Sequence, residues 1–475
     1  MGVEITKKDV TWSYVAKLFQ IGSGLVTLPL ILRLLTKEEV GMNYLMLTVS
    51  SIVGLMDFGF SPQFGRNFTY VNSGARKLCR EGVEEERGGS IDWHLLSVLI
   101  STARFVYRRL SVLALIVMLT FGTGYIWYLT EGFTNVNNSL YIWILYSFST
   151  YFNIYFSYYS SLLTGSGMIR ESSQAAILSK SAYLVLCTVF LLLGWGLFAV
   201  VAANFIAPFV QRYVSYRAYF KPELKARLAE QTVSREDIRE TFSVIWFNAK
   251  KLGINFIGAY AVNKMGMFII GFFLPLATIG SYGLLTQLTT IVTGIANTMF
   301  VTYLPKVSNC RVTGDRPMLK RTISFSMLVG QIIMVAGALG IIFVAPYLLE
   351  LIKSQTMLPS RLVCVLYLVV VALELNHSEF ASVISTENKI PYVVPSLISG
   401  GVIVLLTFIA LKFTTLGLLG VVLVQGIVQA AYNNWRWPLW VFRELDMSIS
   451  EFYRTGFDSI LKTVSGLWKS MHRNA

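Results

Sequence analysis

The chain contains about twelve separate runs of roughly 20 mainly apolar residues, a pattern that leaves few possible folds. A helix of about 20 residues crosses the roughly 30 Å hydrocarbon core of a bilayer, where each backbone N–H and C=O group needs a partner within the protein. The sequence therefore predicts an all-α, polytopic membrane protein with about 12 transmembrane helices. The predicted spans are residues 13–35, 43–64, 103–129, 140–163, 175–193, 196–217, 248–274, 279–303, 323–346, 361–384, 392–412 and 416–438.

Composition excludes several other classes of protein. Hydrophobic residues make up 54% of the chain and charged residues only 14%, whereas soluble domains have about 25% charged residues. The net charge of +14 does not indicate nucleic acid as a partner, because no basic stretch lies outside a membrane flank. The four cysteines lie far apart and there are only three histidines, so we expect no zinc site, no disulfide framework and no bound metal.

The basic residues are concentrated in alternate connections between the predicted spans. Cytoplasmic connections of membrane proteins carry an excess of Lys and Arg, so both termini are predicted to be cytoplasmic. The cations that carry this prediction include Arg76, Lys77, Arg80, Lys221, Lys225, Arg227, Arg316, Lys320, Arg321 and Arg454.

The long polar connection after the sixth predicted span divides the predicted spans six and six. We expect a six-helix bundle at 1–219, a cytoplasmic inter-bundle loop at 220–242 and a second six-helix bundle at 243–442. Residues 443–475 are predicted to form an amphipathic cytoplasmic tail helix on the inner membrane surface, with docking to a partner protein as the alternative.

An internal repeat supports this division into halves. Residues 40–47 align with residues 279–286 at an offset of 239, and residues 50–53 align with residues 289–292. An even number of predicted spans separates the two copies, so both copies have the same orientation. The repeat therefore predicts two parallel bundles related by an axis along the membrane normal.

Four cations lie within or at the ends of predicted spans: Lys17, Arg33, Arg66 and Lys264. An ionisable group near the bilayer centre costs about 2.5–3.5 kcal/mol on insertion scales, so such groups usually face a polar cavity or a partner. We interpret these four as a cationic lumen that binds an anionic substrate, phosphate above all. The alternatives are a structural ion pair for Lys264, snorkelling for Lys17 and Arg33, and a cytoplasmic membrane anchor for Arg66.

Two acids within the spans are candidates for ion coupling. Asp57 lies in the second predicted span and Glu374 in the tenth. Burial raises a carboxyl pKa, so a deeply placed Glu374 is suited to binding a proton. A structural pairing of Asp57 with Arg66 or with a neighbouring helix is the alternative.

The fourth predicted span is rich in tyrosine. Tyr151, Tyr155 and Tyr158 have the spacing of one helical face, and aromatic rings with hydroxyl groups suit contact with sugars. An aromatic belt at the membrane interface, combined with helix packing, is the alternative.

No catalytic constellation is present in the sequence. There is no Walker-type loop and no G-x-S-x-G segment, and the predicted outer loops are too short for a catalytic domain. We therefore do not expect an enzyme.

Several segments resemble one family. The segment Asp57–Asn67 is similar to the end of the second span in bacterial O-antigen (O-unit) flippases, the polysaccharide transporters of the multidrug/oligosaccharidyl-lipid/polysaccharide (MOP) exporter superfamily. Pro29, Arg33, Glu39 and Gly41 resemble the first hairpin of that family. Further similar segments are Pro305–Asp315, Asn388–Tyr392 and Tyr432–Pro438.

This resemblance implies a fold, a cargo and a location. The fold would be the V-shaped pair of six-helix bundles of MATE transporters, alternating between inward- and outward-open states. The cargo would be an undecaprenyl-pyrophosphate-linked oligosaccharide of O-antigen, capsule or exopolysaccharide, moved to the periplasmic leaflet of the bacterial inner membrane. The implied partners are this lipid-linked glycan, the lipid bilayer and, as candidates, polysaccharide polymerase and chain-length machinery. No cofactor is expected, and an H⁺ or Na⁺ gradient would drive transport.

Three other functions are weighed against this one. A MATE-type multidrug or cation antiporter usually relies on acids in its first or seventh span, whereas here the seventh predicted span carries Lys264. A lipid II flippase usually has fourteen spans. A membrane glycosyltransferase or O-antigen polymerase would need a large polar loop, which this sequence lacks.

Overall fold

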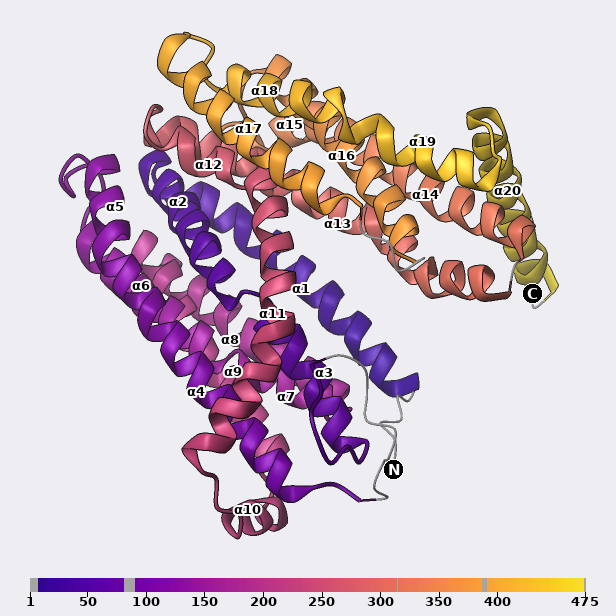
Figure 1. The fold of residues 1–475 in the computed structure, drawn as a ribbon. Coiled ribbons are helices and arrows are strands. Elements are labelled where there is room, and N and C mark those ends of the chain that lie inside the picture. The colour runs from indigo at the N-terminus through magenta and orange to yellow at the C-terminus, as the bar shows by residue number, and fades with distance from the viewer. Residues whose placement is uncertain (1–6, 81–89, 314, 387–390, 474–475) are drawn as a thin grey trace. The chain divides into compact units, whose positions relative to one another are not determined.

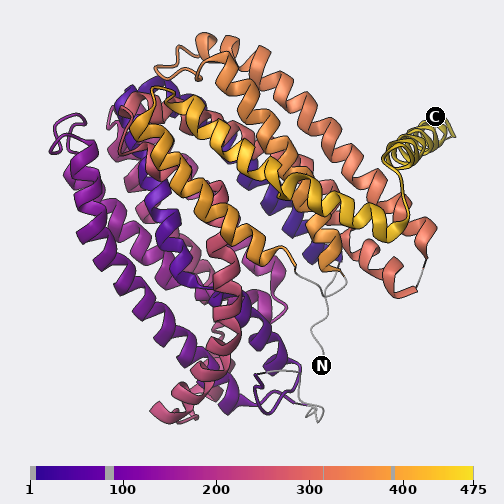
Figure 2. The same cartoon turned by 45° about the horizontal axis from the view of Figure 1, so that its top comes forward.

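The computed structural model describes residues 7–80, 90–313, 315–386 and 391–473, and these residues form helices and connecting turns without any strand. The side chains of some helical residues, Lys17 among them, lie outside the described part of the chain. Contacts divide the chain into two compact units, one of Met1–Ile257 with Pro275–Gly280 and one of Gly258–Leu274 with Ser281–Ala475 (Figures 1 and 2). The predicted division lay earlier, at the 220–242 loop.

The first unit contains the helices coloured indigo to magenta in Figure 1. They are α1 (Lys7–Leu34), α2 (Lys37–Gly54), the 3-10 turn η1 (Leu55–Asp57), α3 (Phe60–Asn72), α4 (Trp93–Val117), the π-helical segment η2 (Met118–Gly122), α5 (Thr123–Leu129), α6 (Ser139–Phe156), α7 (Tyr158–Gly165), α8 (Ile169–Leu192), α9 (Leu197–Tyr219), α10 (Pro222–Ala229) and α11 (Arg235–Asn263). Helix α8 packs against α1 and α9, α6 packs against α4 and α9, and α3 packs against α7.

The second unit contains the remaining helices. They are α12 (Met265–Ile270), α13 (Leu276–Thr313), α14 (Arg316–Leu339), the π-helical segment η3 (Gly340–Val344), α15 (Ala345–Leu351), α16 (Arg361–Ser385), α17 (Val393–Phe413), α18 (Leu418–Ala431), α19 (Asn433–Leu445) and α20 (Ile449–Arg473). The start of α13, through Gly280, belongs to the first unit. Helix α16 packs against α14, α18 and α19, and α17 packs against α12 and α18.

The chain is a polytopic membrane protein, which confirms the predicted fold class. In the described part of the chain, eight helical segments are long and apolar enough to cross a membrane. They are Lys37–Asp57, Trp93–Leu129, Ile169–Leu192, Leu197–Tyr219, Leu276–Leu304, Arg316–Leu351, Arg361–Ser385 and Val393–Phe413.

The other predicted spans differ from continuous helices. The fourth is interrupted at Ser157, the seventh at Lys264 and the twelfth at Tyr432. The first lies in α1, of which Gly22–Leu34 forms a shorter apolar stretch. The prediction of a second span at 43–64 was wrong at its end, because the helix stops at Asp57. Hydropathy detects apolar length but not the polar and charged residues that interrupt a helix.

Helix α11 contributes to both units. A Cβ atom on its Gly253 would overlap the ring of Phe58 in the first unit, whereas a Cβ on its Gly258 would lie 3.2 Å from the side chain of Leu397 in the second. The boundary between the units therefore falls inside a helix, and the loop that was predicted to separate two bundles belongs, with α10, to the first unit.

The tail helix α20 packs against α14 of its own unit. Phe452 is 1% exposed and lies in the apolar cluster with Phe380. The Lys320 ammonium lies 2.9 Å from the Glu451 carboxylate, and this hydrogen bond lowers the pKa of Glu451. The predicted surface helix therefore also packs on a neighbouring helix of its own unit. Exposed apolar residues such as Leu461 leave the opposite face free for lipid.

The start of α13 packs closely on α2. Gly41 and Gly280 are separated by the 239-residue offset of the predicted repeat. A Cβ on Gly280 would lie 3.2 Å from the Gly41 backbone nitrogen, and a Cβ on Gly41 would overlap the carbonyl of Leu276. These two helices approach so closely because neither glycine has a side chain at the contact.

Gly41→Ala is expected to destabilise the protein by about 1–3 kcal/mol, because the added methyl group must displace the backbone at Leu276. Gly54→Ala, in the same helix, is the matched control, since a Cβ there meets nothing within 4 Å. The control should be neutral or slightly stabilising, because alanine is the better helix former. Thermal unfolding of both variants in detergent measures this difference, and equal midpoints would contradict the close helix contact.

Candidate functional site

The Asp57–Asn67 segment, which carries the family resemblance, breaks the second span and starts a new helix. Phe58 and Gly59 have φ values of 48° and 80°, in the left-handed region. The Asp57 carboxylate accepts hydrogen bonds from the Tyr107 hydroxyl on α4 (2.7 Å) and from the backbone N–H of Ser61 (3.1 Å). Asp57 therefore satisfies a backbone donor at the start of α3 and ties this helix to α4.

The left-handed turn also directs the side chain of Phe58 toward helix α11. The ring of Phe58 stacks on Trp246 of α11 at 5.7 Å between centroids, beside Gly253. Phe60 also stacks on Trp246, at 5.6 Å. The predicted pairing of Asp57 with a neighbouring helix is thus observed, with Tyr107 rather than Arg66 as its partner.

Helices α3 and α7 line an open, polar hollow of about 410 Å³. Its lining consists of one arginine, five hydroxyl side chains, a proline and two glycines: Ser61, Pro62, Gly65, Arg66, Thr69, Ser160, Ser161, Thr164 and Gly165. The helices approach closely here because Gly165 has no side chain, and a Cβ atom at this position would overlap the backbone of Gly65. The hydroxyl groups of Ser61 and Ser161 lie 3.0 Å apart across the contact.

This arrangement suits an anionic, hydroxyl-rich ligand. The Arg66 side chain is exposed and donates to the side-chain oxygen of Gln63, one turn earlier in α3. A guanidinium has five N–H donors and matches phosphate and carboxylate groups, while Ser and Thr hydroxyls both donate and accept hydrogen bonds. The volume lies within the roughly 300–1,000 Å³ of small-molecule sites.

The other predicted cations lie elsewhere. Arg33 is exposed in the last turn of α1. Lys264 is exposed at the break between α11 and α12, in the second unit, where its backbone has left the helical conformation (φ −129°). The side chain of Lys17 lies outside the described residues.

The three predicted tyrosines do not share one environment. Tyr151 and Tyr155 are half-buried on α6 and stack with 6.1 Å between ring centroids. Tyr158 is 3% exposed on α7, beyond the break at Ser157, where it packs against Tyr107. The expectation of a single tyrosine face was therefore wrong for Tyr158, because the helix is interrupted before it.

The second unit buries two acids on α16. Glu374 is 8% exposed and accepts a hydrogen bond of 2.9 Å from Gln425 of α18. Glu379 is 2% exposed, and its Oε1 atom has no hydrogen-bond partner among the residues that the structure describes. His377 lies between them in sequence, and its Nδ1 pairs with Asn434 of α19 at 2.8 Å. A buried polar group without a partner is costly, so these groups are candidates for a role beyond packing.

The segment Tyr432–Pro438 forms a second buried polar network. The side-chain amide of Asn433 donates to Ser399 of α17 (2.9 Å) and to Gln429 of α18 (2.8 Å). Its amide oxygen accepts from the Trp437 indole at 3.3 Å. These bonds hold three helices together where the chain breaks between α18 and α19.

The sequence prediction missed a group of arginines on α4. Arg104, Arg108 and Arg109 are all exposed near the start of the third predicted span. The sequence contained a sign of this group, because Arg104 and Arg108 are four residues apart and therefore share one helical face. It was overlooked because cations near the end of a span are readily taken as membrane anchors.

Tyr107→Phe is expected to destabilise the protein by about 1–3 kcal/mol, because it removes one of the two donors to the half-buried Asp57 carboxylate. Tyr141→Phe, at an exposed site, should leave stability unchanged. Adding Asp57→Asn to Tyr107→Phe should cost less than the sum of the two single changes, as unfolding in detergent would show. Additive losses would mean that the two side chains do not interact.

Comparisons with known proteins identify the fold. No protein-family model matches the chain, and no curated protein matches it in sequence. Among solved structures, a multidrug resistance MATE family transporter of the MOP superfamily in an inward-facing conformation is similar at a TM-score of 0.62 and 15% identity, over 93% of this chain and 99% of that one. The lipid II flippase MurJ in an inward closed conformation is similar at a TM-score of 0.63 and 13% identity, over 94% and 90% of the two chains. The chain therefore has the fold of MOP-superfamily transporters.

Proposed function

We propose that this protein is a flippase that moves an undecaprenyl-pyrophosphate-linked oligosaccharide repeat unit from the cytoplasmic to the periplasmic leaflet of the bacterial inner membrane. The repeat unit would belong to O-antigen, capsule or exopolysaccharide. No covalent chemistry is required, and the moving parts are the two units of the chain.

The α3–α7 hollow is the observation that carries this proposal. Arg66, which belongs to the segment that resembles O-unit flippases, lies there among five hydroxyl side chains. A pyrophosphate or an acidic sugar needs a cation, and neutral sugar hydroxyls need partners that both donate and accept. The similarity in fold to MATE transporters and to MurJ supports transport but does not distinguish their cargoes.

Further residues contribute to the same task in this proposal. Lys17, Arg33 and Lys264 remain our candidates for contact with the pyrophosphate or with acidic sugars. The stacked pair Tyr151 and Tyr155 is half-buried, so its exposed edges remain available to sugar rings.

Glu374 is our candidate for coupling to an ion gradient. It is buried and accepts a hydrogen bond from the Gln425 amide, so binding of H⁺ or Na⁺ there would compensate a charge that is costly in the membrane. Asp57 is the weaker candidate, because each of its oxygens already accepts a hydrogen bond.

Arg66→Gln is expected to lower transport roughly tenfold or more, since loss of a charge-assisted hydrogen bond costs about 1.5–3 kcal/mol. The measurement is restoration of surface polysaccharide in a deletion strain, together with the leaflet in which lipid-linked repeat units accumulate. Lys412→Gln, which removes an exposed cation at the end of α17, is the matched control and should restore transport fully.

The deletion strain also tests the cargo. In that strain we expect complete lipid-linked repeat units to accumulate in the cytoplasmic leaflet of the inner membrane. Normal polysaccharide with altered drug tolerance would instead indicate a MATE-type antiporter and refute the proposed cargo.

Glu374→Gln is expected to abolish dependence of transport on the ion gradient while leaving the protein folded, because glutamine is nearly isosteric and can still bond to Gln425. Transport into vesicles with and without an imposed H⁺ or Na⁺ gradient measures this dependence. Glu444→Gln is the control, since that acid pairs with Arg311 away from Glu374 and should retain the gradient response. An unchanged gradient response in Glu374→Gln would exclude this residue as the coupling group.

A further inference from the structure

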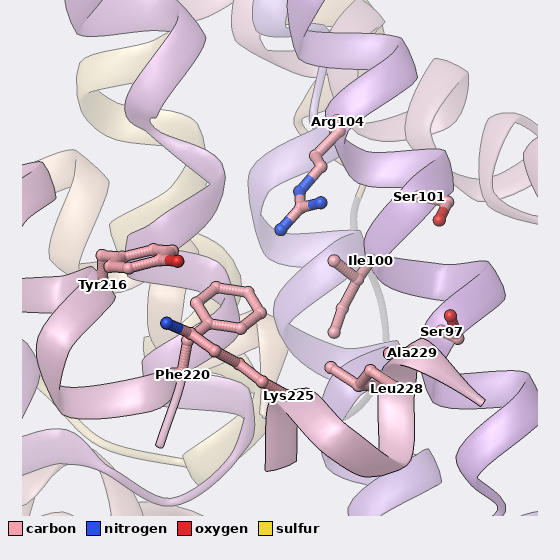
Figure 3. Close-up of a pocket in the computed structure, with 9 residues that line it drawn as sticks. All are labelled: Ser97, Ile100, Ser101, Arg104, Tyr216, Phe220, Lys225, Leu228 and Ala229. Carbon is pink, nitrogen blue, oxygen red and sulfur yellow. The ribbon is translucent and has the colours of Figure 1, made fainter. Parts of the chain in front are cut away.

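A second cationic cavity lies in the first unit, where α9, α10 and α4 meet (Figure 3). Its volume is about 260 Å³. The residues that line it are Ser97, Ile100, Ser101, Arg104, Tyr216, Phe220, Lys225, Leu228 and Ala229. None of the residues that line the α3–α7 hollow is among them, so the two sites are separate.

The local sequence builds this cavity. Helix α9 ends at Tyr219, and Pro222 starts α10 after a short turn, because proline is well suited to the first position of a helix. Helix α10 then packs on α4, with Leu224 and Leu228 against the apolar core of the unit. Lys225, between these two leucines, is thereby brought to the cavity.

Two cations reach this cavity from different helices. The Arg104 guanidinium lies 5.4 Å from the centroid of the Phe220 ring, and the Lys225 ammonium lies 4.8 Å from that of Tyr216. Figure 3 shows Arg104 extending from α4 and Lys225 extending from α10 past Phe220, with the Lys225 ammonium beside the Tyr216 side chain. No acidic residue lines the cavity, and within the described residues no carboxylate forms an ion pair with either cation.

The cavity lies toward the beginning of a span that is longer than the hydrocarbon core. The span that contains Arg104, Trp93–Leu129, has 37 residues, whereas about 20 residues cross the hydrocarbon core. Its first turns therefore extend beyond the core, on the side that the basic connections predict to be cytoplasmic. Trp93, at the start of α4, lies 4.8 Å under the guanidinium of Arg227, and tryptophan is enriched at membrane interfaces.

We propose that this cavity binds a doubly charged phosphate group, a phosphomonoester or a diphosphate, presented at the cytoplasmic membrane surface. Two cationic heads match a group of about −1.5 to −2 charge better than a phosphodiester of single charge. The Tyr216 hydroxyl supplies a further hydrogen bond. The volume is below the roughly 300–1,000 Å³ of sites for drug-sized ligands, so it suits a headgroup rather than an oligosaccharide. This proposal does not depend on the cargo of the transporter.

The full chain in nanodiscs of phosphatidylcholine tests this proposal. Native mass spectrometry measures retention of phosphatidic acid (a monoester) and of phosphatidylglycerol (a diester) added to the discs, and of inorganic pyrophosphate added in solution. We expect phosphatidic acid or pyrophosphate to be retained roughly tenfold better than phosphatidylglycerol. Retention of phosphatidic acid identifies a lipid as the source, and retention of pyrophosphate alone identifies a soluble ligand; either outcome supports the binding chemistry.

Matched variants distinguish the cavity from general surface charge. Arg104→Gln with Lys225→Gln should reduce retention about tenfold or more, because charge-assisted bonds are lost. Arg108→Gln with Lys221→Gln removes the same charge from α4 and from the turn before α10, outside the cavity, and should retain the ligand. If the double variant folds poorly, Lys225→Gln alone, at an exposed site, replaces it as the test of the cavity. Equal retention by wild type and the Lys225 variant, equal loss in the control, or preference for the diester would overturn the proposal.

Discussion

The first unit depends on two hydrogen bonds to one carboxylate, that of Asp57. In a bilayer, a chain that leaves the helical conformation exposes backbone donors for which water is not available, so each break must be satisfied from within the protein. Asp57 accepts from Ser61 at the start of α3 and from Tyr107 on α4. These bonds orient α3, which carries Gly65 to its close approach to Gly165 of α7 and Arg66 to the adjoining hollow.

The two units contain different kinds of polar site. In the first, Arg66 and Arg104 lie in hollows lined by hydroxyl and aromatic side chains, both open to ligands. In the second, Glu374, His377 and Asn433 are held among amide side chains. Exposed cations attract anionic ligands, whereas buried acids bind small cations or protons. This contrast is the physical basis for assigning substrate contact to the first kind of site and ion coupling to the second.

Hydropathy predicted the fold class and most spans because apolar length alone decides whether a helix crosses a bilayer. It did not predict the interruptions at Ser157, Lys264 and Tyr432, since the mean hydropathy of a stretch carries no information on its local backbone conformation. It also placed Tyr158 on one face with Tyr151, although the break places Tyr158 in the core. Arg104 was overlooked because only its packing over Phe220, beside Lys225, distinguishes it from a membrane anchor.

The sequence by itself determined that this chain is an all-helical membrane protein, which residues are charged within its spans, and which segment resembles the O-unit flippases. Only the tertiary structure decided which of these charges lie in cavities and which have partners. Asp57 bonds to Tyr107, fifty residues away, and Arg66 shares a hollow with Ser160 and Thr164 of another helix. Such contacts depend on how helices that are distant in sequence pack, and the periodicity of a single helix does not contain that information.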